Sequence, residues 1–297
     1  MKKLVFGSFN IDRVYTLPHL PEKGETLYTE CYELHEGGKG LNQALSLTKA
    51  SGQCCMAGCV GSDGDFLLDI LDRHGTDTSL VMRVPGFTGH AVIEVDPDGQ
   101  NQMILFPGAN SEITEAYCDR VLSCFSAGDF LLMQCETSCT AYMLEKAKKE
   151  GLITAINPSP FTDKIFDLPL GCVDYFILNE FEGQSLSGAE APREICEALV
   201  EKYPGCRVIL TLGGKGSVYY DGNVYTECPA FKVKAVDTTG AGDTFTGYVF
   251  TELLSGTEPF AALRLASAAS ALAVQRQGAA VAIPDRESVL SFLDENV

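Results

Sequence analysis

Residues 130–157 read FLLMQCETSCTAYMLEKAKKEGLITAIN, two short apolar runs separated by a longer amphipathic segment. The runs Phe130–Gln134 and Ile153–Asn157 lack a polar alternation, which is typical of strands covered on both faces of a parallel sheet. Thr137–Lys149 between them has helical spacing, and its first two residues are good N-caps. A strand, a helix and a second strand in this order predict one βαβ unit.

The same alternation continues along the chain in both directions. Further strand-like runs are Lys3–Gly7, Cys54–Val60, Tyr175–Leu178 and Val208–Leu212. Further helices are expected at Leu41–Lys49, Phe66–His74, Arg193–Lys202, Asp243–Leu254 and Glu258–Val274. We therefore predict an α/β fold with a doubly wound, mostly parallel sheet and helices on both of its faces.

Two segments interrupt this rhythm. Thr26–Leu34 is strand-like, and His90–Asp96 and Asn101–Phe106 are strand-like runs joined by the turn sequence PDGQ. These pieces predict a small antiparallel β-sheet beside the core. Such a sheet serves as a lid over a cleft, pairs with a second copy through its edge, or simply packs on the core as a hairpin.

Composition narrows the class of protein. The 297 residues carry 22 Lys+Arg and 40 Asp+Glu, a formal charge of −18, which argues against nucleic-acid and membrane-surface partners. The N-terminal apolar stretch is too short for a secretory signal, and no apolar run approaches the length of a membrane span. The 12 Cys and 4 His show no metal-site spacing. We expect a cytoplasmic protein with reduced thiols.

The strongest chemical signal is Asp237–Phe245, DTTGAGDTF. The small residues Gly240, Ala241 and Gly242 lead into a helix, whose first amides and dipole favour an anion. A transferring phosphoryl group needs such donors, and Asp243 beside them can accept a proton from an attacking alcohol. The alternative is a plain glycine turn in which Asp243 caps the helix.

Two further segments offer groups suited to a polyol. Gly37–Ala44 (GGKGLNQA) places glycines before a helix in which Asn42 can bond to neighbouring hydroxyls. It has neither Walker A nor GxGxxG spacing. Asn10 and Asp12 alternate just after the first strand, at the ligand-binding edge expected for an open α/β sheet. The alternative for these two is an Asx-turn.

Three smaller features also follow strands. Glu136 follows the run that ends at Gln134. Asn179 and Glu182, one turn apart, can orient a hydrated Mg²⁺, although a helix capping box has the same spacing. Thr211–Gly216 (TLGGKG) can bring a hydroxyl, amides and a lysine to a nucleotide, or form a glycine turn between two strands.

Together these segments resemble the ribokinase branch of the PfkB carbohydrate kinase family. Its signatures GGKGxNQA and DTxGAGDTF correspond to Gly37–Ala44 and Asp237–Phe245. In order with them stand GSxNxD, LMQxE, NPxP, NExE and TLGxxG, at Gly7–Asp12, Leu132–Glu136, Asn157–Pro160, Asn179–Glu182 and Thr211–Gly216. The resemblance implies a ribokinase-like fold and an ATP-dependent sugar kinase, with D-ribose converted to D-ribose 5-phosphate.

The resemblance also assigns residues. It implies Asp243 as the catalytic base and Gly240, Ala241 and Gly242 as the anion hole. The sugar-binding residues would be Asn10, Asp12, Gly38, Lys39, Asn42, Glu136 and Asp243. The ATP side would be Asn179, Glu182, Thr211, Gly213, Lys215, Gly216 and Gly242, with Glu182 holding Mg²⁺ through water. An activating K⁺ would be bound by Asp237, Thr239, Ala273, Arg276, Gly278 and Ala282, mostly through carbonyl groups.

The family pattern divides the chain into a kinase core and a lid. Residues 1–12, 37–86 and 109–297 would form the core, and residues 13–36 and 87–108 the β-sheet lid, with a homodimer formed through the lid sheet. Kinases of the same family acting on deoxyribose, a ketohexose or a nucleoside remain alternatives. A non-catalytic sugar sensor would have lost the base or its glycines. A dinucleotide oxidoreductase would need GxGxxG after the first strand, which this chain lacks.

Overall fold

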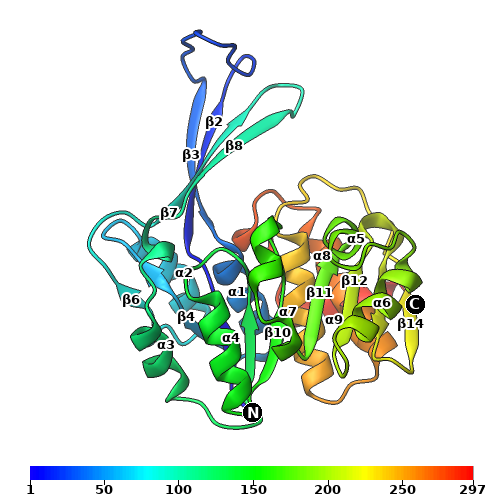
Figure 1. The fold of residues 1–297 in the computed structure, drawn as a ribbon. Helices are drawn as coiled ribbons and strands as arrows, with labels where there is room; N and C mark the ends of the chain where they lie inside the picture. The colour runs from blue at the N-terminus through cyan, green and yellow to red at the C-terminus, as the bar shows by residue number, and fades with distance from the viewer. Residues whose placement is uncertain (297) are drawn as a thin grey trace.

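The apolar runs of the sequence form the central sheet of the computed structural model, which describes residues 1–296 (Figure 1). The strand order of this eight-stranded sheet is β14-β13-β12-β11-β10-β9-β1-β4. The parallel strands are β1 (Lys3–Phe6), β4 (Cys55–Ala57), β9 (Phe130–Met133), β10 (Ile153–Ile156), β11 (Tyr175–Asn179) and β12 (Arg207–Thr211). The antiparallel strands β13 (Ser217–Tyr220) and β14 (Tyr225–Cys228) extend one edge. The predicted mostly parallel sheet is confirmed.

Helices cover both faces of this sheet (Figure 1). One face packs against α1 (Lys39–Ser51), α2 (Asp65–His74), α7 (Ala241–Leu254), α8 (Pro259–Ala273) and α9 (Arg286–Glu295). The other packs against α3 (Glu115–Leu122), α4 (Thr140–Lys149), α5 (Glu180–Ser187) and α6 (Pro192–Lys202). Successive residues of one strand enter opposite cores: Val5 packs in the first, Leu4 and Phe6 in the second. Burial on both faces explains why these strands show no polar alternation.

A second sheet rises from the core as a long arm (Figure 1). Its strands are β2 (Asn10–Thr16), β3 (Cys31–Gly37), β7 (Gly89–Val95) and β8 (Asn101–Phe106), in the order β3-β2-β7-β8. We call these four strands the lid sheet. The β3–β2 and β7–β8 pairs are antiparallel, and the central β2–β7 pair is parallel. The short strands β5 (Cys59–Val60) and β6 (Met82–Arg83) pair separately.

Several local expectations were wrong. The strand expected at Thr26–Leu34 starts only at Cys31, because its partner β2 ends opposite that residue at Thr16. The run Cys54–Val60 divides into β4 and β5, which belong to different sheets.

Neither Thr137 nor Ser138 caps α4, which begins after Cys139 in the left-handed conformation (φ 58°). The Ser138 hydroxyl instead donates to the carbonyl groups of Asn110 and Ile113. Within residues 1–296, no helix is both long and apolar enough to cross a membrane.

Candidate active site

The predicted site residues converge because they follow strands that end at the same edge of the sheet. β1, β9, β10, β11 and β12 are parallel neighbours, so their carboxyl ends lie side by side. The N-termini of α1 and α7 reach the same region, because the two helices pack along one another. This edge is where open α/β sheets bind their ligands.

The carboxylate of Asp243 lies between two side chains of α1. Its Oδ2 accepts a hydrogen bond from Asn42 Nδ2 at 3.2 Å, and its Oδ1 accepts one from Gln43 Nε2 at 2.8 Å. Asp243 is only 6% exposed, so these amides replace water as its partners. The structure therefore brings together the two segments in which we expected sugar binding and phosphoryl transfer. Sequence reasoning missed the role of Gln43, although it lies within the quoted GGKGLNQA segment.

The first turn of α7 has the form of an anion site. Gly240, the residue before the helix, has φ 72°, a left-handed conformation that glycine adopts without strain. A Cβ at this position would approach that of Ala279 to 2.9 Å. Ala241 N–H donates to Thr238 O at 3.3 Å, and no side chain of the described residues caps the helix. First-turn amides not bound to a cap are available to an anion.

A second cluster of hydrogen bonds centres on Glu136. Its Oε1 accepts from Asn10 Nδ2 at 3.2 Å, and its Oε2 accepts from the Lys39 amide at 3.0 Å and from the Ser8 hydroxyl. Asn110 fixes Asn10 from the other side, donating to Asn10 Oδ1 at 2.9 Å. Ser8 lay within a segment we had singled out, whereas nothing in the sequence marked Asn110.

The charges of this region are strongly coupled. Burial, reinforced by the negative charge of Glu136 and opposed by His35, raises the pKa of Asp12 to about 6. Asp243, and more weakly Glu136 and Glu182, raise the pKa of Lys39 against the opposing effect of burial. The Lys39 ammonium group therefore lies among several carboxylates, which leaves this region with an excess of negative charge. An anionic ligand would bind here more favourably if a cation accompanied it.

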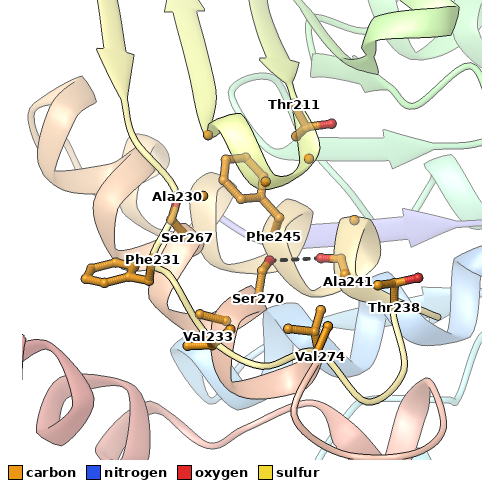
Figure 2. A pocket seen from close by; sticks show the side chains of 16 residues that line it. Thr211, Ala230, Phe231, Val233, Thr238, Ala241, Phe245, Ser267, Ser270 and Val274 are labelled. Atoms are coloured by element: carbon orange, nitrogen blue, oxygen red, sulfur yellow. Dashed lines mark hydrogen bonds between the residues drawn. The ribbon is translucent and has the colours of Figure 1, made fainter.

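A mostly apolar pocket of about 320 Å³ borders the first turn of α7 (Figure 2). Phe245 of α7 and Val274, just after α8, line it together with Phe231 and Val233 of the segment that precedes α7. The turn after β12 and the start of α7 complete the wall through Thr211, Gly213, Gly214, Gly216, Ala241 and Gly242. We call this cavity the α7–α8 pocket. The segment that contains Phe231 and Val233 was missed, because it has no regular secondary structure.

Three residues expected on the nucleotide side make other contacts. Asn179 and Glu182 form a capping box: Asn179 Oδ1 accepts from the Glu182 amide at 2.9 Å, and Glu182 Oε2 accepts from the Asn179 amide at 3.0 Å. The helix capping box that we considered as the alternative for this spacing is therefore present. Burial raises the pKa of Glu182, which is 3% exposed. The Lys215 ammonium group is paired with Glu180 at 3.1 Å. The lining of the α7–α8 pocket contains none of these three side chains.

The residues expected to bind a monovalent cation lie on two adjoining loops. Asp237 connects them: its Oδ1 accepts from the amide and hydroxyl of Thr239, and its Oδ2 accepts from the Gly278 amide at 2.9 Å. Burial opposes a low pKa for Asp237, but these hydrogen bonds outweigh it, and the pKa of its carboxyl is lowered. Val236 N–H also bonds to Val274 O at 2.7 Å. Ala273, Arg276 and Ala282 are on the second loop or at the end of α8.

The family model described as pfkB family carbohydrate kinase matches residues 2–286. The chain belongs to the pfkB carbohydrate kinase family. This pfkB kinase is therefore a phosphotransferase that acts on a carbohydrate, and the family expected from its motifs is confirmed. It is similar to the ribokinase of Haemophilus influenzae, with 34% identity over 299 residues that cover 98% of this chain and 97% of the relative.

Solved structures confirm the fold of this pfkB kinase. The crystal structure of ribokinase from Thermotoga maritima superimposes with a TM-score of 0.86 at 36% identity, covering 99% of each chain. The structure of Arabidopsis thaliana ribokinase, complexed with ribose and ATP, gives a TM-score of 0.85 at 31% identity and covers 98% of each chain. Both likenesses span the core and the lid sheet.

Proposed function

We propose that this pfkB kinase transfers the γ-phosphoryl group of ATP to the terminal hydroxyl of a pentose, forming D-ribose 5-phosphate from D-ribose. The observation that carries the proposal is the position of two successive residues. Gly242 forms part of the wall of the α7–α8 pocket, and Asp243 contacts Asn42 on the side of the Glu136 cluster. A nucleotide in the pocket and a sugar at the cluster would therefore meet at the first turn of α7. The ribokinases among its relatives support this substrate pair.

In this mechanism Asp243 is the general base. Its Oδ2 accepts the proton of the terminal hydroxyl as the oxygen attacks the γ-phosphorus and the bond to the leaving ADP breaks. The amides of Gly240 and Gly242, and that of Ala241 once it is released from Thr238 O, stabilise the charge on the transferring oxygens, where a loose transition state concentrates it. Asn10, Asp12 and the other residues of the Glu136 cluster would hold the remaining hydroxyls, so that the sugar presents one oxygen to Asp243.

The sugar side would include Gly38, Lys39, Asn42 and Glu136 as well. A polyol can take hydrogen bonds from the Asn42 amide and give them to the carboxylates of Asp12 and Glu136. Asn42 Oδ1 is buried and has no hydrogen-bond partner within the described residues, so it has an acceptor available for a hydroxyl. Thr211, Gly213 and Gly216 would contact the nucleotide with Gly242, and Lys215 and Asn179 would lie further out.

The donors fit a divalent cation beside the phosphates. Glu182 is buried and is close enough to Lys39 and Asp243 for their charges to affect its pKa. The carboxylates of Asp243, Glu136 and Glu182 outnumber the single ammonium group of Lys39. We propose that Glu182 orients Mg²⁺ through water. Bound Mg²⁺ would neutralise charge on the phosphate oxygens.

The two loops tied together by Asp237 also fit a monovalent cation. The Asp237 carboxylate already accepts three hydrogen bonds, so we assign it mainly the role of holding the loops together. We propose that K⁺ binds to oxygens of Asp237, Thr239, Ala273, Arg276, Gly278 and Ala282. A cation there would support the positive potential at the first turn of α7.

The lid would close over the sugar and exclude water during transfer. We keep the proposed division into a core (1–12, 37–86 and 109–297) and a lid (13–36 and 87–108), noting that the boundary after residue 12 falls within β2. All residues of β8 are exposed, among them Ile104 at 65% and Leu105 at 53%. We propose that this apolar surface pairs with a second copy in a homodimer. The 12 free cysteines support a reducing compartment, the cytoplasm.

The decisive experiment combines a substrate panel with one variant. ADP release is measured with ATP and ribose, deoxyribose, a ketohexose and a nucleoside, and we expect the highest kcat/KM for ribose. A higher kcat/KM for another compound would identify that compound as the substrate in place of ribose. Asp243→Asn is expected to bind sugar with nearly unchanged affinity and to lose at least about a thousandfold in kcat. Turnover close to that of the wild type would refute the role of Asp243.

A further inference from the structure

A fully buried glutamine beside Asp243 makes contacts that the mechanism above does not use. Gln43 is 0% exposed, and its Nε2 donates to two acceptors. One is Asp243 Oδ1 at 2.8 Å, and the other is Asn157 Oδ1 at 3.0 Å. A primary amide has two N–H groups, so both donors of Gln43 are engaged.

The neighbours of Gln43 fix which way its amide points. Gln43 Oε1 accepts from Gln134 Nε2 at 2.7 Å. Asn157 Nδ2 donates to the carbonyl of Ile177 at 3.1 Å, so the oxygen of Asn157 has to face Gln43. If the Gln43 amide were reversed, its oxygen would face oxygens of both Asn157 and Asp243. The chain of amides therefore leaves Gln43 a single orientation, with a donor directed at Asp243.

This orientation has a consequence for proton transfer. An N–H group directed at Asp243 Oδ1 stabilises a carboxylate, whereas a proton on that oxygen would collide with the donor. The other oxygen, Oδ2, accepts one hydrogen bond, from Asn42 Nδ2 at 3.2 Å, and can still accept a second. The proton of the substrate hydroxyl is thus directed to Oδ2, while Oδ1 stays anchored.

We propose that Gln43, held by Gln134 and Asn157, is a positioning residue that anchors Oδ1 of Asp243 and aims its Oδ2 at the substrate hydroxyl. This inference rests on the proposed function, in which Asp243 is the base. Gln43 contacts neither sugar nor nucleotide in this scheme. Its loss should therefore affect the chemical step rather than the affinity for either substrate.

The test compares two substitutions that retain the approximate size of the side chain. Gln43→Met removes both donors, and we expect kcat to fall at least about tenfold while KM for ribose changes less than about threefold. The acidic limb of the kcat–pH profile should move to higher pH, because the variant loses the donor to Asp243 while the charged groups that act on Asp243, namely Lys39 and Glu182, are unchanged. Gln43→Glu should move that limb further, because two facing carboxyl groups share one proton.

Ser46→Ala is the matched structural control. Ser46 is buried on the same helix, and its hydroxyl donates to Thr244 O at 2.8 Å, so the variant removes an α1–α7 hydrogen bond without touching Asp243. It should keep the wild-type pH profile and a kcat within about twofold of the wild type. Circular dichroism and Tm establish that each variant is folded.

The outcomes separate this inference from the proposed function. An unchanged acidic limb in Gln43→Met, with a kcat no lower than that of Ser46→Ala, overturns the positioning role even if Asp243→Asn is inactive. An active Asp243→Asn enzyme overturns the proposed base instead. If the Gln43 variants do not fold, Asn157→Ala replaces them, since it releases the Gln43 amide from one side. In Asn157→Ala, a smaller shift of the acidic limb to higher pH supports the positioning role of Gln43. An unchanged kcat–pH profile refutes that role.

Discussion

Lowering the pH from 7 to 5 should weaken sugar binding by protonating Asp12. Its pKa of about 6 results from burial and from Glu136, with His35 opposing. With that value, about nine-tenths of Asp12 is ionised at pH 7 and about one-tenth at pH 5. In the proposed sugar site the ionised carboxylate would accept hydrogen bonds from two sugar hydroxyls, so KM for ribose should rise about tenfold over this interval.

The assay is steady-state ADP release at saturating ATP, with kcat and KM for ribose determined in half-unit steps from pH 5 to 8. Asp12→Asn is the control: its KM should be high at every pH and nearly constant. A wild-type KM that stays flat between pH 5 and 7 would refute the coupling between Asp12 and the sugar. An Asp12→Asn variant whose KM for ribose changes with pH as steeply as that of the wild type would refute it as well.

The same ionisation affects stability, with a definite sign. The native pKa of Asp12 lies above the 3.8 of an unperturbed aspartate, so between about pH 4 and 6 the native chain binds more protons than the unfolded chain. The contribution of Asp12 therefore becomes less favourable as pH rises through that window, by at most about 3 kcal/mol given its partial exposure. Asp12→Asn should accordingly raise Tm at pH 7 while it weakens sugar binding.

Three further predictions concern the pocket, the lid sheet and the helix packing. Val233→Trp fills part of the α7–α8 pocket and should raise KM for ATP at least about tenfold, with KM for ribose unchanged; equal effects on both would place the nucleotide elsewhere. Ile104→Asp should convert the proposed homodimer to a monomer in light scattering, whereas a persisting dimer would contradict association through β8. Gly247→Ala places a Cβ against Ser46 Oγ and should lower the stability by about 1–3 kcal/mol; an unchanged Tm would contradict tight packing of α1 against α7 at this position.

The core of the fold was predictable because its strands are buried on both faces and its helices are periodic. The sequence predicts central strands at Phe130–Met133 and Ile153–Ile156, because both runs are short and almost entirely apolar. The strand β2 was not recognised, since its polar sequence NIDRVYT belongs to a sheet that stands away from the core. A strand of this kind is stabilised by its neighbours in the sheet, and local periodicity carries little of that information.

The site was predictable to the extent that its residues follow strands or precede helices. The family resemblance placed Asn42 and Asp243 in one site, and the two side chains are in contact. Gln43 has the same local pattern as any polar residue on a helix, and only the position of Asp243, 200 residues away, suggests the positioning role that we propose for it. Phe231 and Val233 lie in a segment without regular structure, so no spacing rule identifies them as part of a pocket.

The pairing of α1 with α7 has a consequence for synthesis on the ribosome. Most of α1 is buried, and a large part of that cover is supplied by a helix that begins at Ala241. A nascent chain that already contains the segments proposed to bind sugar still lacks this cover, and the surface of α1 that packs against α7 is exposed. Prematurely terminated products should therefore aggregate or be degraded rather than persist as sugar-binding fragments without a kinase centre.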